Sequence, residues 1–584
     1  MNHTQDPAVK PDGVMESVTR RREDAHADKK QQSTETTDTI THINDNPVTM
    51  MDQLTEAAAA AACGDSDPSA QEAQKETTPT AARQQEEEPH SAFSKHEKRF
   101  IVVMVTLASF FSPLSGQIYY PVMPTLVENY HLTTALVNLT ITTYMILQGL
   151  APSFMGTLAD SGGRRPAYIL AFTVYTAANI GLALQNSFAA LLVLRCVQSA
   201  GSSGTVAFGY GVIADIATPA ERGTYIGPMA VGVMIAPALG PVIGGLLAKF
   251  LGWRSVFWFL VIISGGYLVL FTATMPETAR KIVGNGSVPP REWWRMSLLQ
   301  YWASRRQSRN RDDKGNEDRL EDDGSDAQQH HRSTRISFPN PLDSFAILLE
   351  KDAIIIISYV GLVMFSNIAL LTSVPNLFGG LYGFNELQIG LCFIPLGVSA
   401  CIGAMLNGKL VDYNYRRVAR KLNFSVDRKK GDDLRAFPIE RTRLQTVFPL
   451  MALGIVAFLP YGWVLEQRAP LAAPLVLQFI IGLCFISALN TLNTLLVDLF
   501  PDRASTAAAA CNLVRCWLGA VGAAVIDQML VGMGWGWCFG FLGLLMATAL
   551  VLLWLENERG MQWREQRLAK IEVKKNQKDR IVQV

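Results

Sequence analysis

The chain has 584 residues, 49% of them hydrophobic and 18% charged, and its formal net charge is +1 at pH 7. The charged residues gather before residue 100, in 277–351, in 409–443 and after 556, and the stretches between are nearly free of charge. This pattern is typical of a membrane protein and argues against a row of soluble domains. The near-zero net charge averages both kinds of segment, and no nucleic-acid partner is expected.

The N-terminal region is polar. Residues 1–99 are rich in Thr, Gln, Asp and Glu and lack the apolar core of a signal peptide. We expect a disordered cytosolic N-terminal tail over 1–99. The eight cysteines of the chain form no C-x-x-C pair and no cluster with histidines at zinc spacing, so no metal site is expected.

Long apolar runs follow. A helix that crosses the hydrocarbon layer needs about 20 apolar residues, and these runs lack the alternation of barrel strands. We expect an all-α polytopic membrane protein with six-helix halves over 100–276 and 353–556, joined by a cytosolic central linker over 277–352. The twelve expected spans are 101–124, 136–156, 167–185, 189–213, 225–249, 255–275, 354–378, 388–410, 446–465, 471–497, 505–530 and 536–555.

Basic residues mark the connections after the even-numbered spans. Arg164 and Arg165 follow span two, Arg222 follows span four, and a long basic loop over 411–445 follows span eight. The connections after spans one, three, seven and eleven contain no Lys or Arg. Because basic residues stay on the cytosolic side, we expect both termini in the cytosol, including a C-terminal tail over 557–584.

One short charged pattern occurs at matching points of the two halves. GTLADSGGRR at 156–165 follows span two, GKLVDYNYRR at 408–417 follows span eight, and both fit G-x-L-x-D-x-x-x-R-R. Internal repeats with binding at their interface are a transporter architecture.

Three motifs in this order resemble the major facilitator superfamily over about 101–556. GTLADSGGRR resembles its signature between spans two and three, LRCVQSAGSSG in span four its R-x-x-Q-G-type motif, and APALGPVIGG in span five its antiporter signature. FSPLSGQIYYPVMP, TTYMILQGLAPSFMGTLAD and LVDLFPDRASTAAAACNLVRCWLGAVG further resemble the fungal twelve-span drug:proton antiporter group, with its quinidine-resistance-type pumps and its citrate, itaconate and secondary-metabolite exporters. The resemblance implies the major facilitator fold and export across the plasma membrane, without selecting the cargo.

The resemblance also implies roles for two motifs. The repeated charged loop would form contacts that hold the halves together in one state and release them in another. The glycines of span five allow a neighbouring helix to come close, and its proline allows a bend. The gating candidates are Gly156, Asp160, Gly163, Arg164, Arg165, Gly408, Asp412 and Arg416, and the helix-bending candidates are Gly240, Pro241, Gly244 and Gly245.

Buried charge is the strongest functional signal. Arg195 lies inside span four and Arg515 near the middle of span eleven, where a charge costs at least ~2.5–3.5 kcal/mol. The acids lie nearer the span ends, so a net positive cavity and an anionic cargo are favoured; arginines bonded to backbone carbonyls or to acids of other helices are the alternative. The expected cavity residues are Arg195, Gln198, Arg515, Asn512, Asn490, Asn493, Gln117, Tyr120, Tyr144 and Gln148.

No motif indicates an enzyme. The sequence has no G-x-x-x-x-G-K-S/T segment and no nucleophile–base constellation, so no catalytic residue, cofactor or ATP-driven step is expected. We expect a monomeric exporter of a small organic acid, secondary metabolite or drug, with proton countertransport. A bulkier amphiphile such as a glycolipid is an alternative cargo, because the spans are rich in small, Met and aromatic residues. A non-transporting nutrient sensor is the alternative from another class, supported by the long tail and linker.

Overall fold

The structure is a computed structural model that describes residues 91–218, 221–286, 290, 292–302, 305, 347–422 and 437–582. Most of the tail expected to be disordered, residues 1–90, lies outside the described residues. The first described helix begins within the expected tail, at Lys95, where Ser94 and Glu97 form a capping box. Reciprocal bonds between these two residues satisfy donors at the start of the helix, and this fixes the point at which it begins.

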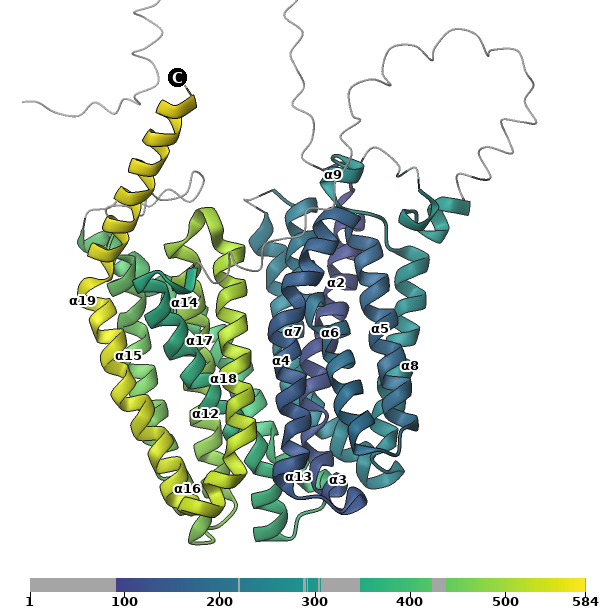
Figure 1. Ribbon diagram of the computed structural model, residues 1–584, viewed down its shortest axis with the longest axis vertical. Helices are drawn as coiled ribbons and strands as arrows, with labels where there is room; N and C mark the ends of the chain where they lie inside the picture. The colour runs from purple at the N-terminus through teal and green to yellow at the C-terminus, as the bar shows by residue number, and fades with distance from the viewer. Residues whose placement is uncertain are drawn as a thin grey trace, which may run out of the picture. The chain divides into compact units, whose positions relative to one another are not determined.

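The described residues are nearly all helical (Figure 1). In the N-terminal half the elements are α2 (Lys95–Gln117), η1 (Tyr120–Val122), α3 (Met123–Tyr130), α4 (Thr134–Gly162), α5 (Arg164–Leu184), α6 (Phe188–Ile216), α7 (Arg222–Leu251) and α8 (Arg254–Thr274), followed in the linker by α9 (Arg280–Val283) and η2 (Trp293–Arg295). In the C-terminal half they are α12 (Lys351–Tyr382), α13 (Glu386–Cys392), α14 (Ile394–Lys421), α15 (Ile439–Phe458), α16 (Tyr461–Glu466), α17 (Ala472–Leu499), η4 (Pro501–Arg503), α18 (Ala504–Met533) and α19 (Trp535–Val582).

The expected spans coincide with these helices. Eleven helical segments of the described residues are long and apolar enough to cross a membrane. The expected fourth span falls on α6, a 29-residue helix that the same criterion leaves out. Its sequence contains Arg195, Gln198 and several Ser and Gly residues, which lower its hydropathy, and most of these polar side chains are buried against neighbouring helices.

Two expected boundaries differ from the structure. Helix α14 continues to Lys421 and α15 begins at Ile439, so the connection expected over 411–445 is shorter. Helix α19 continues without a break to Val582, so residues 557–582 extend the last span instead of forming a separate tail. Both extensions are polar and charged, and hydropathy alone ends a span where the apolar run ends. Helical hydrogen bonding continues beyond that point.

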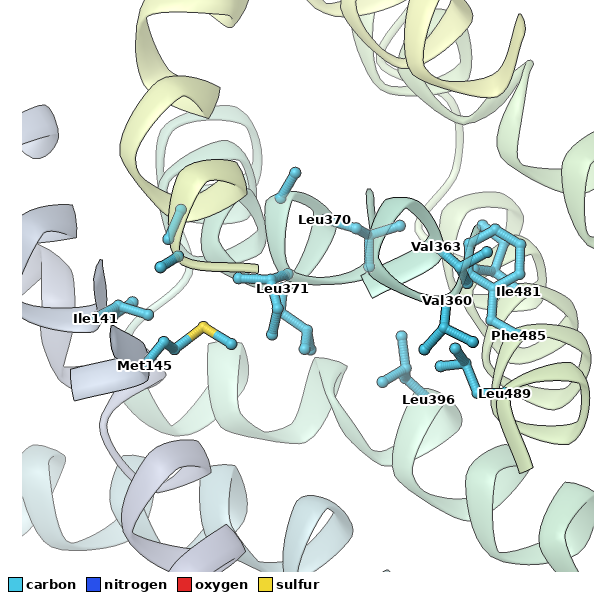
Figure 2. Close-up of a cluster of buried hydrophobic side chains, with 14 of the residues drawn as sticks. Ile141, Met145, Val360, Val363, Leu370, Leu371, Leu396, Ile481, Phe485 and Leu489 are labelled. Atoms are coloured by element: carbon cyan, nitrogen blue, oxygen red, sulfur yellow. The ribbon is translucent and has the colours of Figure 1, made fainter. Parts of the chain in front are cut away.

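Buried apolar side chains join the two halves. One cluster contains Ile141 and Met145 of α4 together with many C-terminal-half residues, among them Leu371 of α12. Figure 2 shows these three side chains pointing toward one another, with Val360, Val363, Leu396, Ile481, Phe485 and Leu489 further along the cluster. A second cluster, around Tyr168 and Phe172, lies wholly within the N-terminal half. The apolar contact between halves is therefore concentrated in the first cluster.

Glycines allow several helices to approach closely. A Cβ on Gly244 would lie 2.1 Å from the carbonyl oxygen of Ile118, and a Cβ on Gly245 would lie 2.3 Å from the carbonyl oxygen of Glu386 in the other half. A Cβ on Gly201 of α6 would lie 2.7 Å from the backbone nitrogen of Tyr175. These positions hold backbones too close together for any side chain, as small residues do in membrane helix packing.

We expect Gly244→Ala to destabilise the folded protein by about 1–3 kcal/mol, because the added methyl group overpacks the contact between α7 and α2. The matched control is Gly227→Ala on the same helix, where a Cβ would meet no atom within 4 Å. Thermal unfolding of both detergent-solubilised variants measures the effect. Equal loss of stability in the two variants would contradict the packing argument.

Candidate functional site

Arg195 of α6 is enclosed by aromatic and amide groups. Its side chain is 1% exposed, and its guanidinium carbon lies 4.1 Å from the ring centre of Tyr119 and 4.3 Å from that of Tyr144. Nη1 donates a hydrogen bond of 2.7 Å to Oε1 of Gln198 and one of 3.4 Å to the carbonyl oxygen of Ser115. Within the described residues no carboxylate forms an ion pair with this arginine, and its Nε has no hydrogen-bond partner.

The two rings are the main compensation for this buried charge. A desolvated cation–π contact is worth about 2 kcal/mol, so two such contacts are comparable with the ~2.5–3.5 kcal/mol that insertion of an arginine costs. The hydrogen bond to Gln198 adds to this sum. Arg195 can therefore remain charged although no carboxylate pairs with it among the described residues.

A chain of amides fixes the orientation of Gln198. Its Nε2 donates to Oδ1 of Asn179 on α5 at 2.7 Å, and Nδ2 of Asn179 donates to the carbonyl oxygen of Tyr175 at 2.8 Å. Tyr144 is fixed on the other side, because its hydroxyl donates to the carbonyl oxygen of Ser112 at 3.2 Å. Sequence reasoning did not select Asn179. A buried amide on the third span was the available signal.

Arg515 of α18 lies at the contact between the halves. It is partly exposed, and its Nη2 donates to Oδ1 of Asn512 at 2.7 Å. Asn512 in turn donates to the carbonyl oxygen of Gln148 on α4, across the two halves, at 3.3 Å. The described residues offer Arg515 no ion pair, and its Nε has no hydrogen-bond partner. A positive charge without a carboxylate partner therefore lies partly exposed on α18, next to α4.

The remaining expected cavity residues belong to neither of these two networks. Tyr120 stacks on Phe393 of the other half with ring centres 5.8 Å apart, and Gln117 faces Gly240 of α7. Asn493 accepts a hydrogen bond from Cys511 at 3.2 Å and thereby joins α17 to α18. Asn490 is half-buried on α17. The structure thus groups Arg195, Gln198 and Tyr144 in one network and Gln148, Asn512 and Arg515 in another.

The first copy of the charged repeat forms ion pairs inside the N-terminal half. Arg164 contacts Oδ1 of Asp160 at 2.6 Å and Oδ2 of Asp215, at the end of α6, at 3.0 Å. A Cβ on Gly156 would meet no atom within 4 Å, so the last turns of α4 have open space beside them. In this conformation the loop fastens α4, α5 and α6 to one another.

Arg165 is buried below this ion pair. It donates hydrogen bonds to the carbonyl oxygens of Thr272 and Met275, at 2.7 and 3.1 Å, and to that of Trp294. The first two are unpaired carbonyls at the C-terminal end of α8, where a cation is also favoured by the helix dipole. Arg165 thus caps α8 in this structure, whereas Arg164 forms partly buried ion pairs.

Gly163 has a positive φ of 111° between α4 and α5. A Cβ there would lie 2.5 Å from Oε2 of Glu277, whose carboxylate accepts from the backbone nitrogens of Arg164 and Arg165 at 2.9 and 3.2 Å. Burial raises the pKa of Glu277, and its backbone hydrogen bonds, two more of which come from Thr278 and Ala279, oppose that rise. Sequence reasoning missed Glu277. It lies beyond the apolar run of α8, where only its proximity to Gly163 could have revealed it.

The second copy of the repeat is arranged differently. Because α14 continues past it, Asp412 and Arg416 lie on the helix and are exposed, and a Cβ on Gly408 would meet no atom within 4 Å. The position of Arg164 is taken by Arg443 of α15, which pairs with Asp498 at the end of α17 at 2.9 Å. The conserved spacing of the repeat therefore does not predict an equivalent structure, since helix length differs between the halves.

A further charged cluster was not expected from the sequence. Arg564 and Arg567, on the extension of α19, pair with Glu440 of α15 and Asp352 of α12 at 3.1 and 2.8 Å. Glu556 is fully buried beside Glu440. These contacts dock the extension of α19 on the ends of α12 and α15. Among the described residues, no group of three or more His, Cys, Asp or Glu side chains could hold a metal ion.

Comparisons with known proteins agree with this architecture. The family model of the Major Facilitator Superfamily matches residues 105–524. The MFS-type transporter phiD of a fungal species is 42% identical over 488 residues, which are 83% of this chain and 72% of that protein. The MFS-type transporter tstD of Talaromyces stipitatus is 41% identical over 84% of this chain and 86% of its own length.

Two further proteins extend the comparison. Quinidine resistance protein 1 of Saccharomyces cerevisiae is 35% identical over 81% of this chain and 85% of its own length. Among solved structures, the xylose transporter XylE from E. coli in a partially occluded inward open conformation matches with a TM-score of 0.53 and 15% identity, over 79% of this chain and 97% of that one. At this identity the likeness concerns the fold.

We expect Arg165→Ala to destabilise the protein by about 1–3 kcal/mol, because the buried carbonyl of Met275 loses its donor and two partly buried carbonyls lose theirs. The matched control is Arg417→Ala in the second copy of the repeat, where the arginine is exposed. Thermal unfolding in detergent distinguishes the two. A normal melting temperature for Arg165→Ala would show that capping of α8 is not its main contribution.

Proposed function

The chain belongs to the Major Facilitator Superfamily and is a multi-pass membrane transporter, and we propose that it exports a small organic acid, secondary metabolite or drug across the fungal plasma membrane, driven by protons entering in exchange. Because its relatives are named as transporters, it is not an enzyme. The name of the quinidine resistance protein supports export of a toxic compound over nutrient uptake.

The observation that carries the cargo assignment is the unpaired charge of Arg515. This arginine is partly exposed between the halves and has no carboxylate partner among the described residues. A bound carboxylate would supply the missing acceptor, and charge-assisted hydrogen bonds from a guanidinium to a carboxylate are about twice as strong as bonds between neutral groups. An anionic cargo is therefore favoured over an uncharged amphiphile.

Arg195 has a different part in this proposal. It is enclosed by Tyr119, Tyr144 and Gln198, so no cargo touches it in this conformation. Its positive charge acts on groups between α4 and α6, and we assign it a part in proton coupling. A change in protonation nearby would alter the cost of keeping this charge buried, and such a cost can bias two conformations.

The contacts between the halves support alternating access. They include Thr125 with Glu386, Tyr120 with Phe393, and Thr142 with the carbonyl oxygen of Ala520. The first two lie near α13 and the third lies on the N-terminal side of Gly149 in α4, whereas the ion pairs of Arg164 and Arg443 each stay within one half. With both termini in the cytosol, this arrangement corresponds to an inward-facing state, from which cargo would be loaded for export.

We expect deletion of the gene to lower one acidic metabolite in the medium and raise it in the cells, as measured by mass spectrometry of both fractions. The reason is that the cargo stays in the cell when its exporter is absent. An uncharged amphiphile that changes instead would favour the alternative cargo. If neither pool changes and the deletion strain responds abnormally to nutrients, the sensor would be favoured.

We expect Arg515→Gln to raise KM for an anionic cargo by roughly 10- to 100-fold, because a hydrogen bond to a charged group contributes about 1.5–3 kcal/mol. Transport into inside-out vesicles measures this. The control is Arg503→Gln, an exposed arginine directly before the same helix. An unchanged KM for Arg515→Gln would show that this arginine does not contact the cargo.

A further inference from the structure

A short segment of the central linker exposes large apolar side chains. In residues 292–302, here called the linker segment, Trp294, Leu298, Leu299 and Trp302 are between 47% and 65% exposed. The segment contains η2 and a helical stretch over 298–302, which places Leu298 and Trp302 one turn apart. Four large apolar side chains on one short charged segment indicate a surface that contacts something other than water.

The position of the linker segment is fixed by Arg165. Its guanidinium donates to the carbonyl oxygen of Trp294 and also to those of Thr272 and Met275 at the end of α8. The segment therefore lies at the level where α8 ends, next to α5 and α8 (Figure 1, teal). That level is the boundary between hydrocarbon and headgroups for a helix that crosses the bilayer.

We propose that the linker segment lies in the headgroup layer of the cytosolic leaflet and binds anionic phospholipids. Three observations commit the surface to lipid. Arg165 joins it to the end of α8, whose last turns expose Val269 (71%) and Leu270 (46%). Two of its exposed side chains are tryptophans, which favour the membrane interface. The sequence 291–306 contains four arginines and one glutamate; Arg295 pairs with Glu292, and the net positive charge that remains complements anionic headgroups.

This binding would connect the bilayer with the charged loop. Arg165 joins the linker segment to the end of α8, and its neighbour Arg164 holds Asp160 and Asp215. A lipid that holds the linker segment would therefore also hold the first turn of α5. The inference depends on the membrane-spanning assignment and not on the cargo or on proton coupling, so it can fail while the transport proposal stands.

The first test attaches an environment-sensitive fluorophore to Leu299→Cys in the full chain, reconstituted in nanodiscs with brominated phospholipids. The control position is Val573→Cys, an equally apolar exposed site on the extension of α19, and the labelled unsubstituted chain gives the background of native cysteines. We expect strong quenching at Leu299, weak quenching at Val573, and stronger quenching at Leu299 with phosphatidylserine than with phosphatidylcholine alone. Quenching at Leu299 no greater than at Val573 would overturn the proposal.

The second test removes the apolar surface. The variant Trp294→Gln, Leu298→Gln, Leu299→Gln, Trp302→Gln is compared with Ile571→Gln, Val573→Gln, which changes exposed apolar residues of α19. Native mass spectrometry counts the phosphatidylserine molecules retained by each solubilised protein. We expect the first variant to lose retained lipid relative to the unsubstituted chain and the second to keep it. Equal retention by all three proteins, or equal preference for phosphatidylcholine, would contradict binding of anionic lipid at this segment.

Discussion

The buried charge of Arg195 is the constraint on which the rest of the N-terminal half depends. An arginine in the middle of a span must be compensated, and here the compensation is two tyrosine rings and one amide instead of an acid. Each compensating group needs its own support, so α2, α4, α5 and α6 all contribute backbone or side-chain contacts to the same network. One buried charge therefore fixes how four helices are arranged around it.

Close backbone packing gives this charge a rigid surrounding. Gly201 brings α6 against α5, and Gly244 brings α7 against α2, at distances that exclude any side chain. The same packing occurs between the halves: Gly245 of α7 meets the backbone of Glu386, and Gly390 of α13 meets the backbone of Pro241. When the halves move relative to one another, these backbone contacts between them must change. Such contacts are either formed or lost, as a two-state transporter requires.

Much of this architecture could be predicted from the sequence, because spans, basic loops and small-residue motifs are local patterns. The order of the spans and the close packing at Gly244 follow from them. Two features could not be predicted. The capping of α8 by Arg165 depends on where α8 ends, and the ion pair that Arg443 forms, where the repeat would place Arg416, depends on where α14 ends. The cluster of Asp352, Glu440, Arg564 and Arg567 joins residues distant in sequence, so no local pattern marks it.

The central proposal is that transport is coupled to protons and that the buried charge of Arg195 takes part in the coupling. Its most direct measurement uses purified protein in proteoliposomes loaded with a pH-sensitive dye, with the identified cargo on one side only. The account predicts that movement of the cargo down its gradient drives protons in the opposite direction, and that Arg195→Gln abolishes this proton movement. Cargo movement at the normal rate with no pH change in the unsubstituted protein would contradict it.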